Sequence, residues 1–75
     1  MKAEQLQALV QKGFSEVLGR DVDAQTDFFD AGGDSLAAER LLLGLSKALG
    51  VELAGWMVLD HPTPEALSAA LGQIA

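Results

Sequence analysis

Apolar residues recur along this chain at the spacing of an α-helix, and no segment alternates in the manner of a strand. Residues 3–18 give the clearest example, in which the apolar positions are Leu6, Leu9, Val10, Phe14, Val17 and Leu18. Intervals of three and four residues place such side chains on one helical face. Gly19 follows as the expected C-terminal cap. The pattern predicts an all-α fold.

A second helix is expected to begin near Asp34 or Ser35 and to run to about Leu49. A carboxylate at this start accepts hydrogen bonds from backbone N–H groups and complements the helix dipole. Gly50 then ends the helix. Its core-facing side is predicted to be a continuous stripe made of Ala38, Leu41, Leu42, Leu45 and Leu49.

Two leucines of the same segment point in another direction. Leu36 and Leu43 lie seven residues apart, and at roughly 100° per residue Leu43 is about 160° from Leu41. They are therefore expected to be exposed at least in part, beside Glu39, Arg40 and Lys47. Two interpretations remain open. Single surface leucines are common, but apolar side chains among charges also suit a helix face that docks partners.

The last helix is expected over residues 64–74. Thr63 can cap it, and Pro64 fits the first helical position because its missing N–H costs nothing there. Its inner face is predicted to be Leu67, Ala70, Leu71 and Ile74. Between the second and last helices, residues 54–60 form at most a brief helical turn, because Gly55 weakens the segment.

These segments make three main helices plus a short third one, and a small four-helix bundle is the economical arrangement. The length of 75 residues predicts a single domain over 1–75. The sequence has no Cys and one His, so neither disulfides nor a structural zinc can stabilise it. With 49% hydrophobic residues, apolar packing is left to hold the fold together.

A long connection separates the first two helices. Residues 20–33 are rich in polar residues and glycine, and loops of such length in a small domain are usually functional or anchored. At least one ring of Phe28 and Phe29 is expected to bury between helices and anchor this loop. The segment Asp27–Asp30 is a candidate for a short helical turn.

The chain is acidic, with a net charge of −6. This charge argues against nucleic acid as a partner and favours proteins with basic patches. No basic residue precedes Arg40 in the stretch that holds six carboxylates, namely Asp21, Asp23, Asp27, Asp30, Asp34 and Glu39. Such a run is either a solvated surface or an address that partners recognise. With no signal peptide and no apolar stretch of about 18 residues, a cytoplasmic protein outside the membrane is expected.

The order Gly33-Asp34-Ser35-Leu36 resembles the block of a class of serine hydrolases, but a serine nucleophile needs a neighbouring base. The only histidine is His61, which lies in a capping segment. The nucleophile elbow also fails, since Ala37 stands where its second glycine belongs. A calcium loop starting at Asp21 would have Thr26 in place of its glycine and Gly32 in place of its final glutamate.

Ser35 is then a serine at a helix start with no activating base of its own. One interpretation is an ordinary helix N-cap. In the other, a second protein modifies the serine: Gly32 and Gly33 let a foreign backbone approach closely, and the helix N-terminus favours a phosphate attached there.

The segment Asp27–Leu36 closely resembles the phosphopantetheine-attachment segment of carrier proteins, which serve fatty-acid, polyketide and nonribosomal peptide synthesis. The similarity includes the first helix, the link Leu49–Leu53 and the start Asp60–Pro64 of the last helix. It implies an acyl-carrier-protein-like fold. It also implies a non-catalytic protein that carries 4'-phosphopantetheine, taken from coenzyme A, on Ser35.

By that resemblance, a phosphopantetheinyl transferase modifies Ser35, and the thiol of the arm holds aminoacyl, peptidyl or acyl groups as thioesters. Adenylating or acyltransferring enzymes load it, and condensing or tailoring enzymes receive the cargo. The family contacts partners at the positions of Asp34, Leu36, Glu39, Arg40 and Leu43. For Trp56 two roles are open, a cap on the core or a contact with cargo or partner.

The glycine pair before Asp34 favours the peptidyl subclass, and we expect a monomer. An acyl carrier of polyketide or fatty-acid synthesis is the first alternative. A helical interaction module without covalent chemistry is the second.

Overall fold

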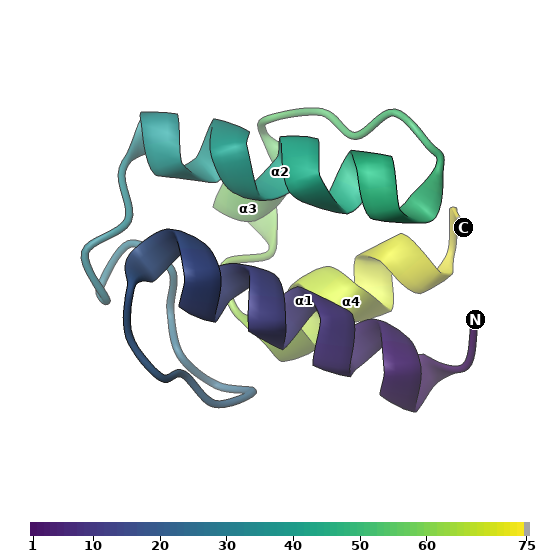
Figure 1. Ribbon diagram of the computed structural model, residues 1–75, viewed down its shortest axis with the longest axis horizontal. Coiled ribbons are helices and arrows are strands. Elements are labelled where there is room, and N and C mark those ends of the chain that lie inside the picture. Colours follow the sequence, from purple (N-terminus) through teal and green to yellow (C-terminus); the bar gives the residue numbers. More distant parts are fainter. Residues whose placement is uncertain (75) are drawn as a thin grey trace.

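Four helices follow one another along residues 1–74, the part of the chain that the computed structural model describes (Figure 1). They are α1 (Ala3–Leu18), α2 (Ser35–Leu49), α3 (Met57–Asp60) and α4 (Pro64–Gly72). Within this range no residue is in a strand. The long helices α1 and α2 run antiparallel, and α1 packs against both α2 and α4 (Figure 1). The predicted all-α arrangement of three main helices and a short third one is confirmed.

The first helix has the ends and the inner face that its sequence predicts. At its start, the backbone N–H of Lys2 donates to the side chain of Gln5 at 3.2 Å. At its end, Gly19 adopts a left-handed conformation (φ 70°), and its N–H donates to the carbonyl of Ser15. The residues of α1 that are buried in the core are Leu6, Val10 and Phe14.

The two faces predicted for α2 are both present. Ala38, Leu41, Leu42 and Leu45 are buried, and Leu49 packs against them from the edge of the core. On the other side, Leu36 is 65% exposed and Leu43 is 58% exposed. Gly50 ends the helix with φ 71°. The helix therefore buries one stripe of leucines and presents another to its surroundings.

The last helix begins as predicted and ends earlier. The N–H of Ala66 donates to the Thr63 hydroxyl at 3.1 Å, and Pro64 occupies the first turn. The prediction that Ile74 belongs to the inner face is wrong, because α4 ends at Gly72 and Ile74 is 58% exposed. The N–H of Ile74 bonds to the carbonyl of Leu71 at 3.1 Å. This bond to the third preceding residue tightens the chain and turns Ile74 away from the core.

Phe28 anchors the long loop between α1 and α2. Its side chain is fully buried, and its ring meets that of Phe14 edge to face, with centroids 5.2 Å apart. The ring of Phe29 packs on the other side at 5.3 Å and stays partly buried. The predicted burial of at least one ring is confirmed. Edge-to-face contacts of this kind are favourable beyond the area that they bury.

Backbone hydrogen bonds also join this loop to the segment around α4. The N–H of Phe28 donates to the carbonyl of Pro62 at 2.8 Å, and the N–H of Glu65 donates to the carbonyl of Ala24 at 3.0 Å. The Asp27 carboxylate accepts from the N–H groups of Phe29 and Asp30, and the N–H of Ala31 donates to the Asp27 carbonyl at 3.0 Å. The segment therefore makes the short helical turn predicted for it, a single turn that does not continue into a helix. The loop is thus fixed at two points, Ala24 and Phe28.

No helix in residues 1–74 combines the length and the hydropathy that crossing a membrane would require.

Candidate functional site

Ser35 is the first residue of α2, and its side chain is exposed. The residue before it supplies the cap: a carboxylate oxygen of Asp34 accepts from the N–H of Ala37 at 2.8 Å. The interpretation of Ser35 as an ordinary N-cap is therefore wrong, because Asp34 occupies that position. The Ser35 hydroxyl lies at the helix start, and the capping hydrogen bond is made by Asp34 instead.

The two glycines before Asp34 build the turn that delivers Ser35 to the surface. Gly32 has φ 103°, a backbone conformation that side chains rarely allow. Gly33 lies against Phe28, and a Cβ added there would overlap the ring and lie 2.7 Å from the Phe28 carbonyl oxygen. From the sequence, these glycines are expected only to let the backbone of another protein approach closely. Their role inside the fold could not be foreseen, since it depends on the ring that Gly33 covers.

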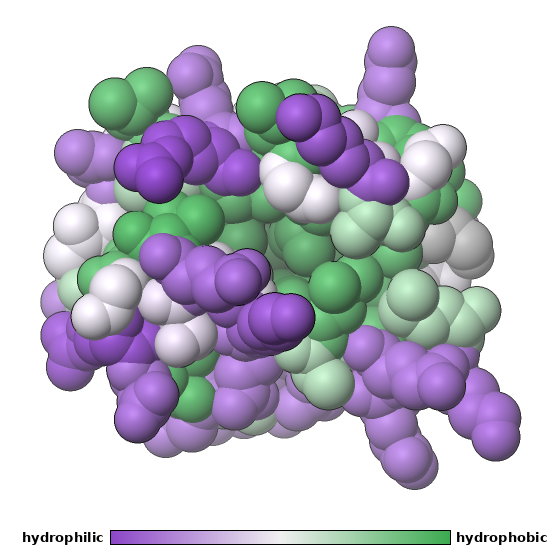
Figure 2. All heavy atoms as spheres, in the orientation of Figure 1, coloured by the Kyte–Doolittle hydropathy of each residue, from purple (hydrophilic) through white to green (hydrophobic). Residues whose placement is uncertain are grey.

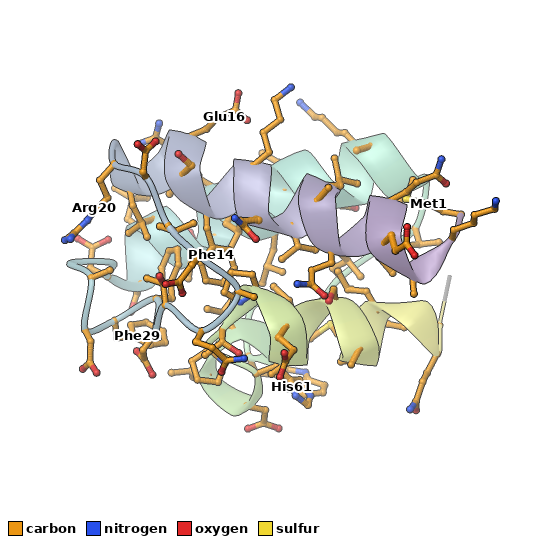
Figure 3. The ribbon with its side chains drawn as sticks, turned by 90° about the horizontal axis from the view of Figure 1, so that it is seen from below. Met1, Phe14, Glu16, Arg20, Phe29 and His61 are labelled. Atoms are coloured by element: carbon orange, nitrogen blue, oxygen red, sulfur yellow. The ribbon has the colours of Figure 1, made fainter. Side chains whose placement is uncertain are left out.

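In the described part of the chain, no base is hydrogen-bonded to the Ser35 hydroxyl. His61 is the C-cap residue of α3, where its backbone N–H donates to the carbonyl of Met57 at 2.9 Å, and it is half-buried (Figure 3). Among the hydrogen bonds of residues 1–74, none joins His61 to Ser35. In the same residues no three His, Asp or Glu side chains gather in a way that could hold a metal ion. The site therefore holds an unactivated hydroxyl.

The residues predicted to meet partners are exposed but do not form one cluster. Glu39 and Leu43 line a shallow groove of about 360 Å³ between α2 and the link that follows it, together with Glu52 and Gly55. Arg40 instead lines a different groove, between α1 and α2. The exposed face of α2 thus separates two grooves.

Trp56 does not cap the core. It directly precedes α3, and its side chain is 57% exposed, so that interpretation is wrong. Leu59, in α3 itself, is 68% exposed and was not singled out from the sequence. The sequence pattern gives little indication that Leu59 is exposed, because a helix of four residues is too short to show a hydrophobic period. Both residues add apolar surface near α3.

The surroundings of Ser35 fit a phosphodiester attached to its hydroxyl. The side chain is exposed, so a substituent meets no packed neighbour. The start of α2 presents backbone N–H groups and the positive end of the helix dipole, which favour a phosphate. Asp34 directs its carboxylate to the N–H of Ala37, within the first turn.

The class of the protein follows from a family model. The model described as the phosphopantetheine attachment site matches residues 8–71, so the chain belongs to that family. The fold agrees: BlmI, a type-II acyl carrier protein from Streptomyces verticillus involved in bleomycin biosynthesis, superposes with a TM-score of 0.92. That superposition covers 96% of this chain and 88% of BlmI at 23% identity.

Two further proteins resemble the chain in sequence. A solved nonribosomal peptidyl carrier (PCP) domain is 36% identical, with a TM-score of 0.76 over 92% of this chain and 90% of that domain. The probable non-canonical nonribosomal peptide synthetase CymA of Salinispora arenicola (strain CNS-205) is 44% identical over 59 residues, which are 77% of this chain. The chain spans about 1% of the length of CymA.

The chain is therefore a carrier protein domain of the type found in nonribosomal peptide and polyketide systems. Its family binds a 4'-phosphopantetheine prosthetic group and is generally non-catalytic. Carrier domains of these systems interact with the partner domains of synthetases. A helical module without covalent chemistry is not favoured, because the family is defined by its attachment site.

Proposed function

We propose that Ser35 is the residue that carries 4'-phosphopantetheine. The observation that supports this most directly is the exposed hydroxyl at the start of α2. Asp34, and not Ser35, makes the capping hydrogen bond of this helix. The Ser35 oxygen forms the new bond to phosphorus, and the pyrophosphate bond of coenzyme A breaks with release of adenosine 3',5'-bisphosphate. The hydroxyl proton passes to a base of the modifying enzyme. When bound, the group supplies a thiol that holds cargo as a thioester.

The chain contributes position and recognition to this function. Residues 1–75 act as a single carrier domain, a substrate of a phosphopantetheinyl transferase and of adenylating or acyltransferring loading enzymes. Condensing or tailoring enzymes then receive the cargo. Partners contact exposed side chains on α2 and before α3, which are Asp34, Leu36, Glu39, Arg40, Leu43 and Trp56.

The cargo that we favour is an aminoacyl or peptidyl group. Gly32 and Gly33 before the modified serine support this subclass, as does the 36% identity to a nonribosomal peptidyl carrier domain. An adenylating enzyme that loads amino acids should therefore charge the modified protein faster than an acyltransferase does. Faster loading by the acyltransferase would assign the chain to the acyl carriers.

Modification at Ser35 is tested by incubating the full chain with coenzyme A and a transferase of broad specificity, followed by intact-mass analysis. One adduct is expected on the wild type and none on Ser35→Ala. Ser15→Ala is the matched control, since this serine lies near the end of α1 and should leave the adduct unchanged. No adduct on the folded wild type, or an adduct on Ser35→Ala, would contradict the proposal.

A further inference from the structure

A second groove lies between α1 and α2, away from the groove that Glu39 and Leu43 line. Its volume is about 270 Å³, and apolar side chains of both helices form its walls, among them Leu9, Val17 and Leu45. Figure 2 views the molecule onto α1 and α2 and shows this apolar hollow between hydrophilic side chains. The surface is accessible along both helices.

Two glycines shape this groove, and only one of them packs closely against the facing helix. Gly13 packs so closely on α2 that an added Cβ would lie 2.9 Å from a methyl group of Leu41. Gly44 lies in the middle of α2, with no heavy atom within 4 Å of where its Cβ would be and no positive φ. Glycine weakens a helix relative to alanine, so Gly44 costs helix stability without an internal reason. What it provides is a backbone that another element can approach closely.

The charges around the groove differ from those of the rest of the surface. The sequence contains five Lys and Arg residues. Lys12 and Arg40 line the groove, and Lys47 lies within about 20° of Arg40 on α2 because it follows seven residues later. Glu16 is the one acidic residue of the lining. The acidic loop before α2 lies at the end of the helix pair instead (Figure 1).

Screening decides which of these charges a docked molecule experiences. At physiological ionic strength the screening length is about 8 Å, so cations at the rim outweigh carboxylates at the far end of the molecule. A ligand in the groove therefore meets apolar walls, a glycine that allows close approach, and a locally basic rim.

From this combination we propose that the α1–α2 groove docks an amphipathic helix of a partner protein, with apolar residues on its inner ridge and Asp or Glu on both flanks. Small or apolar ridge residues lie against Gly44 at the close approach that helix pairs use. The flanking carboxylates pair with Lys12, Arg40 and Lys47 and fix the register. The interaction does not depend on modification of Ser35.

The test uses the full chain labelled with nitrogen-15 and a synthetic helical peptide of about 15 residues. The peptide carries Leu and Ala on one ridge and Glu on both flanks, and its twin carries Lys in place of every Glu. Saturable shifts of the Gly13 and Gly44 amide signals are expected with the Glu peptide. The Lys peptide should bind at least about tenfold more weakly.

Gly44→Leu fills the groove from a position with open space, so the chain should still fold. It should weaken binding of the Glu peptide at least about tenfold while leaving phosphopantetheine transfer to Ser35 unchanged. The matched control is Ala69→Leu, a similar enlargement at an exposed position of α4, which should bind like the wild type.

Four results would overturn the proposal. One is the absence of saturable shifts, and a second is equal binding of the two peptides. A third is wild-type affinity of Gly44→Leu. The fourth is loss of the Gly44 signal at rising protein concentration without peptide, since that would assign the groove to a second copy of this chain. Because transfer to Ser35 is measured separately, failure of the proposed function would leave these outcomes intact.

Discussion

At the scale of single residues, Gly33 and Asp34 together determine where α2 begins. Gly33 has no side chain and so leaves room for the Phe28 ring, and the Asp34 carboxylate accepts a hydrogen bond from the N–H of Ala37. The chain can then enter the helix only at Ser35, which leaves this side chain on the surface. The exposed position of the Ser35 hydroxyl is therefore a consequence of packing two residues earlier.

Gly33→Ala should destabilise the protein by about 1–3 kcal/mol, because the added methyl group overlaps Phe28, including its backbone oxygen. Gly44→Ala is the matched control, and it should stabilise by about 1 kcal/mol, since it adds helix propensity in open space. Urea unfolding followed by circular dichroism measures both. A Gly33→Ala variant as stable as the wild type would show that the loop adjusts freely.

Asp34 caps α2, and we also propose that partners recognise its charge; two substitutions separate these roles. Asp34→Ala should cost about 0.5–2 kcal/mol through loss of the cap, whereas Asp34→Asn should keep the cap and the stability. If partners read the charge, both variants should be modified more slowly by the transferase. If phosphopantetheine is transferred to Asp34→Asn at the wild-type rate, the Asp34 carboxylate acts only as a helix cap.

At the scale of the elements, most features of the helices could be predicted because they depend on neighbours in sequence. The caps at Asp34 and Thr63 and the left-handed glycines at 19 and 50 are local signals, and all are confirmed. The end of α4 was misjudged, because tightening after Gly72 overrides the apolar spacing of Ile74. The exposure of Trp56 depends on tertiary packing and has no local signal.

The outer stripe of α2 should affect function more than stability. Leu43→Asp should change the free energy of unfolding by less than about 0.5 kcal/mol, because this side chain is 58% exposed. Leu42→Ala, one residue earlier and buried, should cost about 2–5 kcal/mol. Loading rates and thermal midpoints measured together check this. A large loss of stability in Leu43→Asp would place that residue in the core.

At the scale of the whole molecule, the loop between α1 and α2 behaves as a structural element in its own right. Phe28 fills the core below it, and its backbone bonds to the segment that leads into α4. The sequence indicated the anchor, since two adjacent aromatic residues stood out in a polar stretch. The bonds to Pro62 and from Glu65 could not be foreseen, because they join residues distant in sequence.

Amide exchange should reveal this cross-linking. The N–H groups of Phe28 and Glu65 should exchange with solvent only when the molecule opens globally, although neither forms a bond within a helix. The N–H of Gln25, bonded only to the exposed Asp23 carboxylate, is the control and should exchange rapidly. Equal rates at all three positions would mean that the loop opens independently of the helices.

Both ends of the described chain lie at the pole of the molecule opposite the start of α2 (Figure 1). Met1, Leu49 and Gly72 line a common pocket there, at one end of a body whose longest dimension is 28 Å. A polypeptide fused to either end would therefore emerge on the side facing away from Ser35. This polarity allows the domain to be embedded in a longer chain, or immobilised on a support through a terminal tag, while Ser35 remains exposed.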